Sequence, residues 1–210
     1  FLARVPPSRS HGLSWISTHH TGSCELVGEY YASAASGTIP RKDRDGRMED
    51  IQDAWNRMPD KSLDALSGVL QEHQYGSGKW MIFRPLSEID AVWQCIVKHF
   101  WSGALGPRIK CSGPKEKSHV ICVYVDPFFD IEEVTRVLRA LREKCGIHEE
   151  LKFKADGVTL LDIYRDNEWN IPPSFYSSPK GSTQVIELAG GSQKRRARAG
   201  AGRGGGGNVF

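Results

Sequence analysis

The segment "HVICVYVDPFFDIEEVTRVLRALREKCG", residues 119–146, decides the fold class. Residues 119–125 are rich in β-branched and aromatic side chains and apolar on both faces, which predicts a strand near the centre of a sheet. The following residues have apolar side chains at a helical spacing. Asp130 and Glu133 have the layout of a capping box, and Gly146 stands where the helix should end. A buried strand followed by an amphipathic helix predicts helices packed against a sheet.

Short strands and helices alternate irregularly on either side of this segment. A second clear helix is predicted at 87–101, opened by a capping box of Ser87 and Asp90, and weaker helices at about 48–58 and 62–73. Strands are predicted at 12–18, 79–83, 108–112, 151–154 and 158–164. This order predicts the α+β class: an antiparallel sheet with helices packed on one face.

The composition predicts one folded domain flanked by two irregular segments. Residues 1–10 contain two adjacent prolines and no apolar period, so we expect a flexible arm. The domain should cover residues 11–178 and include a long loop at 32–47. Residues 179–210 contain the stretch "GGSQKRRARAGAGRGGGG", which is rich in Gly and Arg and lacks core-forming side chains, so they predict a disordered tail. The sequence begins with Phe1 rather than Met, which favours a fragment of a longer chain.

The positive charge is concentrated in this tail. The net charge is +3, and the residues after Glu187 carry five cations and no acid; subtracting them leaves −2 for residues 1–188. We expect the tail to attract RNA without regard to its base sequence. Its cations are Lys194, Arg195, Arg196, Arg198 and Arg203.

Cysteine usage and hydropathy restrict the cellular compartment in which we expect the protein. The five cysteines are odd in number and show no CxxC spacing, which predicts reduced thiols and a cytoplasmic or also nuclear protein. The longest apolar run, "VICVYV", is far too short to cross a membrane. His19, His20, Cys24 and Glu25 could suggest a metal site, but adjacent His residues point to opposite sides of a strand and no second ligand pair follows. We therefore expect no metal and no cofactor, and the chain should be a monomer.

The motif "GSGK", residues 76–79, resembles a phosphate-binding loop only superficially. His73 stands where the first Gly of that loop belongs, and Trp80 replaces the hydroxyl residue that would bind magnesium. The motif also leads into a predicted strand instead of a helix. Cys111 and His119 are the other pair considered, as a thiol and its base, but the sequence gives them no orienting partner. We therefore expect no enzymatic activity.

A basic cluster on and after the predicted strand 108–112 allows two interpretations. Arg108, Lys110, Lys115 and Lys117 lie close together in the sequence. Such a cluster is often only a solvated turn, but it can also present several cationic groups to one phosphate chain.

Several segments together resemble a known family. They are "GLSWIS", "MEDIQDAWNRM", "SGKWMIF", "VWQCIVKHFWSGALG", "HVICVYVDPFFDIEEVTRVLRALREKCGI", "LKFKAD" and "IYRDNEWNIPPSFY", within residues 11–176. This combination resembles the basophilic leukemia-expressed protein family, which is little characterised. The resemblance implies a fold similar to the cap-binding translation initiation factor 4E: a strongly curved antiparallel sheet with helices on its convex face.

The resemblance also implies roles for individual residues. Lys79 stands where the factor has an arginine in a Gly-Gly-Arg-Trp turn, and Lys110, Lys115 and Lys117 fall where basic residues contact the cap phosphates. Trp55 is similar in position to the tryptophan that receives adaptor peptides in the factor; the alternative interpretation is a core-facing helix residue.

The factor's two guanine-stacking tryptophans are missing here. Residues 19–47 contain no Trp, and "GVLQEHQY" offers Tyr75 as an aromatic substitute. Loss of both stacking partners would cost about 2–6 kcal/mol, so tight cap binding is not expected.

We therefore expect a non-enzymatic binding module that contacts RNA or a nucleotide-like ligand on its concave face. Phosphates would be contacted by Lys79, Arg108, Lys110, Lys115 and Lys117, and a base would stack on Tyr75. The alternative is a protein-interaction module that kept the fold and lost the ligand site, with adaptor proteins binding at Trp55.

Overall fold

The computed structural model describes residues 6–9, 15–19, 41–113 and 118–188. Within these residues the strands form one seven-stranded antiparallel sheet in the order β1-β3-β4-β2-β5-β6-β7. The strands are β1 (Trp15–His19), β2 (Gly78–Arg84), β3 (Arg108–Ser112), β4 (His119–Val125), β5 (Leu151–Ala155), β6 (Tyr176–Ser178) and β7 (Ile186–Glu187). The predicted α+β class is confirmed, and β4 lies inside the sheet between β3 and β2, as predicted.

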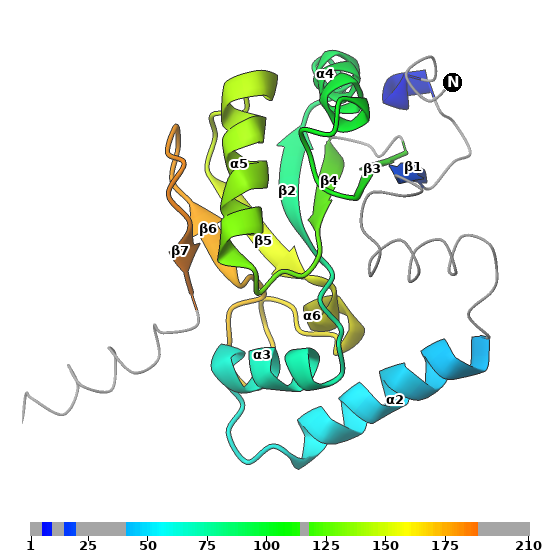
Figure 1. Ribbon diagram of the computed structural model, residues 1–210, viewed down its shortest axis with the longest axis vertical. Helices are drawn as coiled ribbons and strands as arrows, with labels where there is room; N and C mark the ends of the chain where they lie inside the picture. Colours follow the sequence, from blue (N-terminus) through cyan, green and yellow to red (C-terminus); the bar gives the residue numbers. More distant parts are fainter. Residues whose placement is uncertain (1–5, 10–14, 20–40, 114–117, 189–210) are drawn as a thin grey trace, which may run out of the picture.

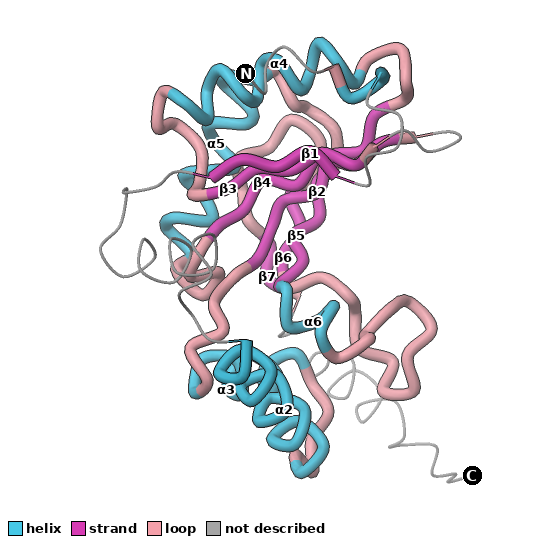
Figure 2. Tube along the Cα trace, turned by 90° about the vertical axis from the view of Figure 1, so that its right-hand side faces the viewer, coloured by secondary structure: helices cyan, strands magenta, loops and turns pink. Residues whose placement is uncertain are grey.

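The helices fall into two groups. α4 (Ile89–Trp101) and α5 (Ile131–Cys145) lie on one side of the strands, whereas α2 (Arg41–Arg57), α3 (Leu63–Glu72) and the short α6 (Asp156–Leu160) lie below them (Figures 1 and 2). A 3-10 turn, η2 (Pro7–Arg9), precedes β1. No helix in the described part of the chain is long and apolar enough to cross a membrane.

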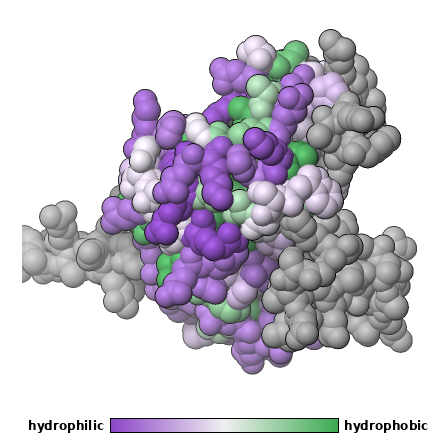
Figure 3. Space-filling model, turned by 45° about the horizontal axis from the view of Figure 1, so that its top comes forward, coloured by the Kyte–Doolittle hydropathy of each residue, from purple (hydrophilic) through white to green (hydrophobic). Residues whose placement is uncertain are grey.

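The hydrophobic core includes the layer between the sheet and helices α4 and α5, and it extends to buried residues of α2 and α3 such as Trp55 and Leu66. Trp80 of β2 is fully buried on this side, and its indole Nε1 donates a hydrogen bond to the Val134 carbonyl of α5 at 3.2 Å. The Phe153 ring of β5 meets Trp80 edge-on at 5.3 Å between centroids. Hydrophilic side chains predominate on the face seen in Figure 3, with apolar groups in small patches among them.

The two predicted helix caps have different outcomes. At α5, the Asp130 carboxylate accepts from the backbone N–H groups of Glu132 and Glu133, and Gly146 ends the helix at φ 65°. At α4, the predicted capping box is wrong: the helix begins at Ile89, and Glu88 occupies the N-cap without a side-chain bond. Asp90 instead accepts hydrogen bonds from the backbone N–H and the hydroxyl of Ser8 in η2. The Asp90 carboxylate therefore bonds to a residue distant in the sequence, Ser8, instead of capping α4.

Four sequence-based predictions need correction: one strand, the start of one helix and the two ends of the domain. The predicted strand at 158–164 is wrong: the chain forms α6 and then turns, and Val158, Leu161 and Ile163 are buried without pairing in the sheet. Helix α2 begins at Arg41, inside the predicted loop 32–47.

Both ends of the predicted domain also move. Residues 7–9 of the expected arm form η2, which lies against α4. At the other end, β7 extends the sheet past residue 178 through its pairing with β6. The rest of the expected tail lies outside the described residues.

Candidate functional site

Strand alternation places a set of cations on the side of the sheet opposite α4 and α5. Lys79 lies across from Tyr124 of β4 on one side and from Lys154 of β5 on the other, and Lys110 of β3 lies across from Cys122. Their apolar neighbours in the strands point to the helices, because successive side chains point to opposite faces. We call this side the basic face; its cations are Lys79, Arg108, Lys110, Lys152 and Lys154.

The Tyr124 ring is the centre of the basic face. The Arg108 guanidinium carbon lies 3.6 Å from the ring centroid, and the Nζ atoms of Lys110 and Lys79 lie 5.6 Å and 5.7 Å from it. All three cations are within the range of a cation–π interaction. The ring itself is 1% exposed. Tyr124 therefore gathers three positive charges around one aromatic side chain.

Asp156, at the start of α6, supplies a carboxylate to the same cluster. It forms an ion pair with Lys79, accepts from the Ser77 hydroxyl at 2.8 Å, and lies 3.5 Å from Nη2 of Arg108. The backbone N–H of Asp156 also donates to the Ser77 carbonyl at 2.8 Å, which continues the pairing of β2 with β5. These contacts fix Lys79 and Arg108 relative to each other.

Lys154 connects the cluster to an exposed aromatic residue. Its Nζ lies 4.5 Å from the centroid of Tyr164 and 3.5 Å from the Ile163 carbonyl. Lys154 is 9% exposed, whereas Tyr164 is 54% exposed. A large aromatic surface thus stands next to the buried cations.

The electrostatics show that these cations are crowded. Burial lowers the pKa of Lys110, and the positive charges of Lys79 and Arg108 lower it further, against the opposing effect of Asp156. Burial also lowers the pKa of Lys154, again helped by Lys79. Desolvation and like charge both disfavour the ammonium form, and a bound anion would counteract both effects. The geometry therefore suits a ligand that carries several negative oxygens.

The two glycines of "GSGK" serve close packing. A Cβ on Gly76 would lie 2.8 Å from Asp126 Oδ1, and one on Gly78 would overlap the ring of Phe153. Neither glycine has a positive φ angle. Lys79 is the part of the motif that reaches the basic face.

Of the predicted phosphate contacts, the structure brings together Lys79, Arg108 and Lys110. Lys115, Lys117 and the tail cations Lys194, Arg195, Arg196, Arg198 and Arg203 lie outside the described residues. Tyr75 does not present a free ring for stacking, because its half-buried side chain packs against the hydrophobic core.

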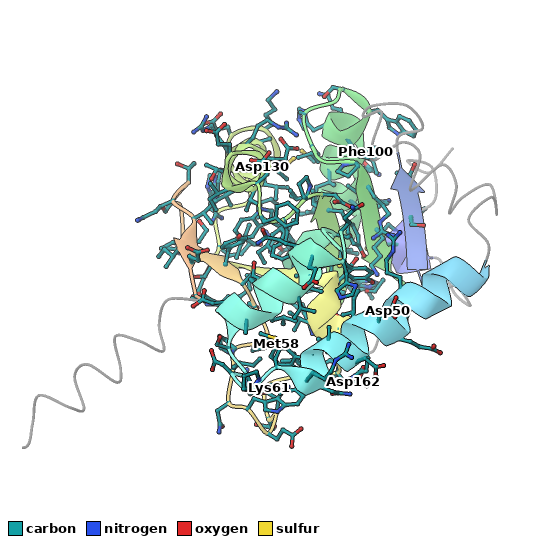
Figure 4. All side chains as sticks on the ribbon, turned by 60° about the horizontal axis from the view of Figure 1, so that its bottom comes forward. Asp50, Met58, Lys61, Phe100, Asp130 and Asp162 are labelled. Carbon is teal, nitrogen blue, oxygen red and sulfur yellow. The ribbon has the colours of Figure 1, made fainter. Side chains whose placement is uncertain are left out.

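Trp55 lies in the core, which agrees with its interpretation as a core-facing helix residue and not with an adaptor-binding role. Trp55 is 0% exposed, and Trp169 meets its ring edge-on at 5.4 Å between centroids. Lys61 lies over the same ring with its Nζ 4.7 Å from the centroid. Figure 4 shows Met58 and Lys61 where α2 passes into α3. Trp169, in the loop that follows α6, therefore packs on the Trp55 side chain that an adaptor peptide would have to contact.

Four further residues of the basic face were not identified from the sequence: Tyr124, Lys152, Lys154 and Asp156. The available signal was the alternation in "LKFKAD", which places Lys152, Lys154 and Asp156 on one side of a strand. What the sequence did not supply was the pairing of β5 with β2, which brings that side next to Lys79.

Cys111 and His119 have no arrangement suited to nucleophilic catalysis. Burial raises the pKa of the Cys111 thiol to about 12, and its Sγ lies 3.5 Å from the Ser112 carbonyl. Nδ1 of His119 is engaged with the same carbonyl at 3.0 Å. A thiol with so high a pKa is a poor nucleophile.

A family comparison covers the part of the chain that carries the basic face. Residues 41–162 match the model of the family described as "Basophilic leukemia-expressed protein Bles03". The chain belongs to this family. The matched segment runs from α2 to the turn after α6, so it includes Lys79, Lys110, Tyr124, Lys154 and Asp156. Strands β1, β6 and β7 and the exposed Tyr164 lie outside the match.

Proposed function

We propose that the protein is a non-enzymatic binding module whose basic face binds the phosphate groups of RNA or a nucleotide. The observation that carries this proposal is the convergence of Arg108, Lys110 and Lys79 on Tyr124 at 3.6–5.7 Å. Guanidinium and ammonium groups in such a cluster can bind several oxygens of one phosphate chain.

Phosphate binding would explain why the fold places like charges close together although this is unfavourable. Burying like charges near one another is unfavourable, and the lowered pKa values of Lys110 and Lys154 express that cost. A phosphate ligand would turn the repulsion into attraction, so the cluster is organised before the ligand arrives. Preorganised charge favours binding because little ordering remains to be done.

We further propose that the fold is similar to that of translation initiation factor 4E. Support comes from the antiparallel sheet with α4 and α5 on one side, and from the turn before β2 that places Lys79 beside the buried Trp80 (Figure 2). A tight methylated-cap complex is not part of the proposal. Tyr124 is covered, and the exposed Tyr164 is the aromatic residue next to the cations on which one base would stack.

Titration of the full chain with three phosphate ligands tests the site. Fluorescently labelled short RNA, a nucleoside triphosphate and a methylated cap analogue are compared at low salt. Lys110→Glu should weaken binding of each by about 10-fold to 100-fold, the range for losing a charged hydrogen bond. Lys98→Glu is the matched control, because it makes the same charge change at an exposed position on α4.

Two results would refute this proposal. One is the absence of binding below millimolar concentration for all three ligands. The other is equal weakening by Lys110→Glu and Lys98→Glu, which would show attraction by net charge alone. Inorganic triphosphate, added as a fourth ligand without a base, tests the stacking role of Tyr164. Tyr164→Leu should weaken RNA binding about 5-fold or more and leave triphosphate binding unchanged.

The pH dependence of binding has a defined sign. Because the pKa values of Lys110 and Lys154 are lowered from 10.5, both lysines lose their charge at a lower pH than ordinary lysines. Affinity for a phosphate ligand should therefore fall as the pH rises toward 10.5. A flat profile over this interval would argue against Lys110 and Lys154 as contacts.

The basic tail contributes to the proposed RNA affinity. Deleting residues 189–210 removes five cations. For single-stranded RNA the slope of log K against log salt should become less steep by about 3 to 4. The same deletion should leave Lys110→Glu as damaging as before, which distinguishes the tail from the basic face.

A further inference from the structure

Three soft metal-ligand side chains meet on the helical side of the molecule, away from the basic face. Cys95 and His99 are one turn apart on α4, and Cys145 is the last residue of α5. One ligand atom from each, the two Sγ atoms and a ring nitrogen, can be chosen so that all lie within 4.8 Å of one another. All three residues are half-buried.

The packing of α4 against α5 creates this group. Residues four apart share one face of a helix, so Cys95 and His99 both point toward the same neighbour. The Cys95 thiol donates to the Lys144 carbonyl at 3.6 Å, which holds it at the C-terminal end of α5. Gly146 ends α5 directly after Cys145, in the left-handed conformation.

We propose that Cys95, His99 and Cys145 bind a thiophilic d10 metal ion, with Zn²⁺ as the reference ion. Two thiolates and one imidazole form a ligand set known for zinc, and the fourth position would be held by water or an external ligand. This inference does not rest on the proposed phosphate-binding function.

The distances allow the site to form with small movements. Bonds of about 2.3 Å to sulfur and about 2.0 Å to nitrogen bring tetrahedral ligand atoms to within about 3.3–3.8 Å of one another. The three ligand atoms lie within 4.8 Å of one another, so they must approach by about 1 Å, and rotation of the side chains can achieve this. Partial exposure leaves a path by which the ion can enter and a place for the fourth ligand.

A disulfide between Cys95 and Cys145 is the competing interpretation. It leaves His99 without a role, although the imidazole lies within reach of both sulfurs. A metal ion would use all three side chains, and its ligand atoms already lie close together.

Cobalt substitution tests the site in the reduced full-length chain. Co²⁺ should bind with one-to-one stoichiometry and give a thiolate-to-cobalt charge-transfer band together with the visible bands of a tetrahedral ion, and Zn²⁺ should abolish both. Cys95→Ser, Cys145→Ser and His99→Asn should each weaken the affinity by at least about 10-fold to 100-fold, since even outer-shell changes can have effects of this size.

Matched controls use the same substitutions elsewhere. Cys122→Ser changes a thiol on the basic face, and His148→Asn changes an exposed histidine. Both should bind Co²⁺ as the unmodified chain does. The proposal is overturned if no charge-transfer band forms, or if the three ligand variants retain it at unchanged affinity.

Two measurements on the unmodified protein keep the test valid if a variant fails to fold. X-ray absorption of the zinc-loaded chain should show two sulfur neighbours and at least one nitrogen neighbour, and Zn²⁺ should raise the melting temperature because it binds only the folded state. A zinc shell without sulfur would overturn the proposal. So would a peptide map showing Cys95 linked to Cys145 in protein that binds no Zn²⁺ after reduction.

Discussion

Alternate residues of the same strands give the two sides of the sheet different characters: one side buries apolar side chains and the other carries charged groups. Trp80 of β2 is buried beneath α5 with its one polar atom hydrogen-bonded. Its neighbour Lys79 is also buried, on the basic face, where it meets Asp156, Lys154 and Tyr124. One side gains stability by removing apolar area from water. The other side gathers charge that burial disfavours, which is the pattern expected of a binding surface and not of a stabilising core.

A cation on the helical side sharpens this contrast. Arg142 of α5 is 3% exposed, and its guanidinium donates hydrogen bonds at 2.6–3.2 Å. The acceptors are the carbonyls of Ile147, Glu149, Pro179 and Ser182 and the hydroxyl of Ser178. Fixed dipoles of the protein satisfy this charge and hold residues 178–182 against α5. On the basic face, Lys79 and Arg108 share the carboxylate of Asp156 and lie close to other cations. This difference supports the proposal of ligand binding for the basic face and indicates a structural role for Arg142.

The largest expected effect is the loss of Trp80. Trp80→Ala should lower the free energy of unfolding by about 3–5 kcal/mol, because it leaves a large cavity under α5. Urea denaturation measures the change. Met81→Ala, the next residue and on the opposite side, should cost clearly less. Equal costs would mean that the two sides do not differ in packing as described.

Arg142→Met should destabilise the protein by about 2–4 kcal/mol. The substitution keeps much of the apolar stem but leaves buried carbonyl groups without a donor. Hydrogen exchange should show that residues 178–182 open before the rest of the sheet. Arg142→Lys should rescue little, because an ammonium cannot reproduce the planar fork. Full stability of Arg142→Lys would contradict the structural role.

The Lys79–Asp156 pair should show measurable coupling. Lys79→Met and Asp156→Asn should each cost about 1–3 kcal/mol, and the double variant should cost less than their sum by more than about 0.5 kcal/mol. The exposed pair of Lys152 and Glu150 is the control, and its coupling should be about 0–0.5 kcal/mol. Indistinguishable couplings would show that burial on the basic face does not strengthen the ion pair.

The smallest expected effect is a pH dependence at the Arg84–Glu149 pair on the helical side. Burial tends to raise the pKa of Glu149, but the two hydrogen bonds from Arg84, at 2.5 and 2.8 Å, outweigh it and hold the pKa below 4.5. The pair therefore stabilises the fold above pH 4.5, and this contribution is lost as the pH falls through the lowered pKa.

The difference in the free energy of unfolding between Glu149→Gln and the unmodified chain checks this sign. It should be below about 1 kcal/mol at neutral pH, because Glu149 is about one-third exposed and solvent screens the pair. It should then disappear at acid pH. A difference that grows on acidification would contradict the lowered pKa.

Local sequence patterns were sufficient for the elements whose stability is local. The stripe of α5, the Asp130 cap and Gly146 all lie within one helix, so their pattern could be recognised without a partner. The pattern failed where tertiary contacts compete with local ones. Asp90 bonds to Ser8 instead of capping α4, and residues 158–164 bury apolar side chains from a short helix and a turn instead of a strand.

For the candidate site, residue type was predictable and assembly was not. Lys79, Arg108 and Lys110 were predicted as phosphate contacts, and the structure brings their side chains together, whereas Trp55 and Tyr75 pack against the core. An amphipathic pattern identifies a buried face without identifying what covers it. The cover of Trp55, the Trp169 ring, comes from a distant part of the chain.

The sequence by itself determined the α+β class, the central position of β4, the capped helix α5 and the family to which the chain belongs. Only the tertiary structure decided that β5 pairs with β2, and thereby that Lys154 and Asp156 join Lys79 around Tyr124. The same is true of the meeting of Cys95, His99 and Cys145 at the α4–α5 contact. The physical reason is that hydrophobic periodicity fixes which face of an element is buried, whereas the choice of neighbour depends on strand order and chain reversal across the whole fold.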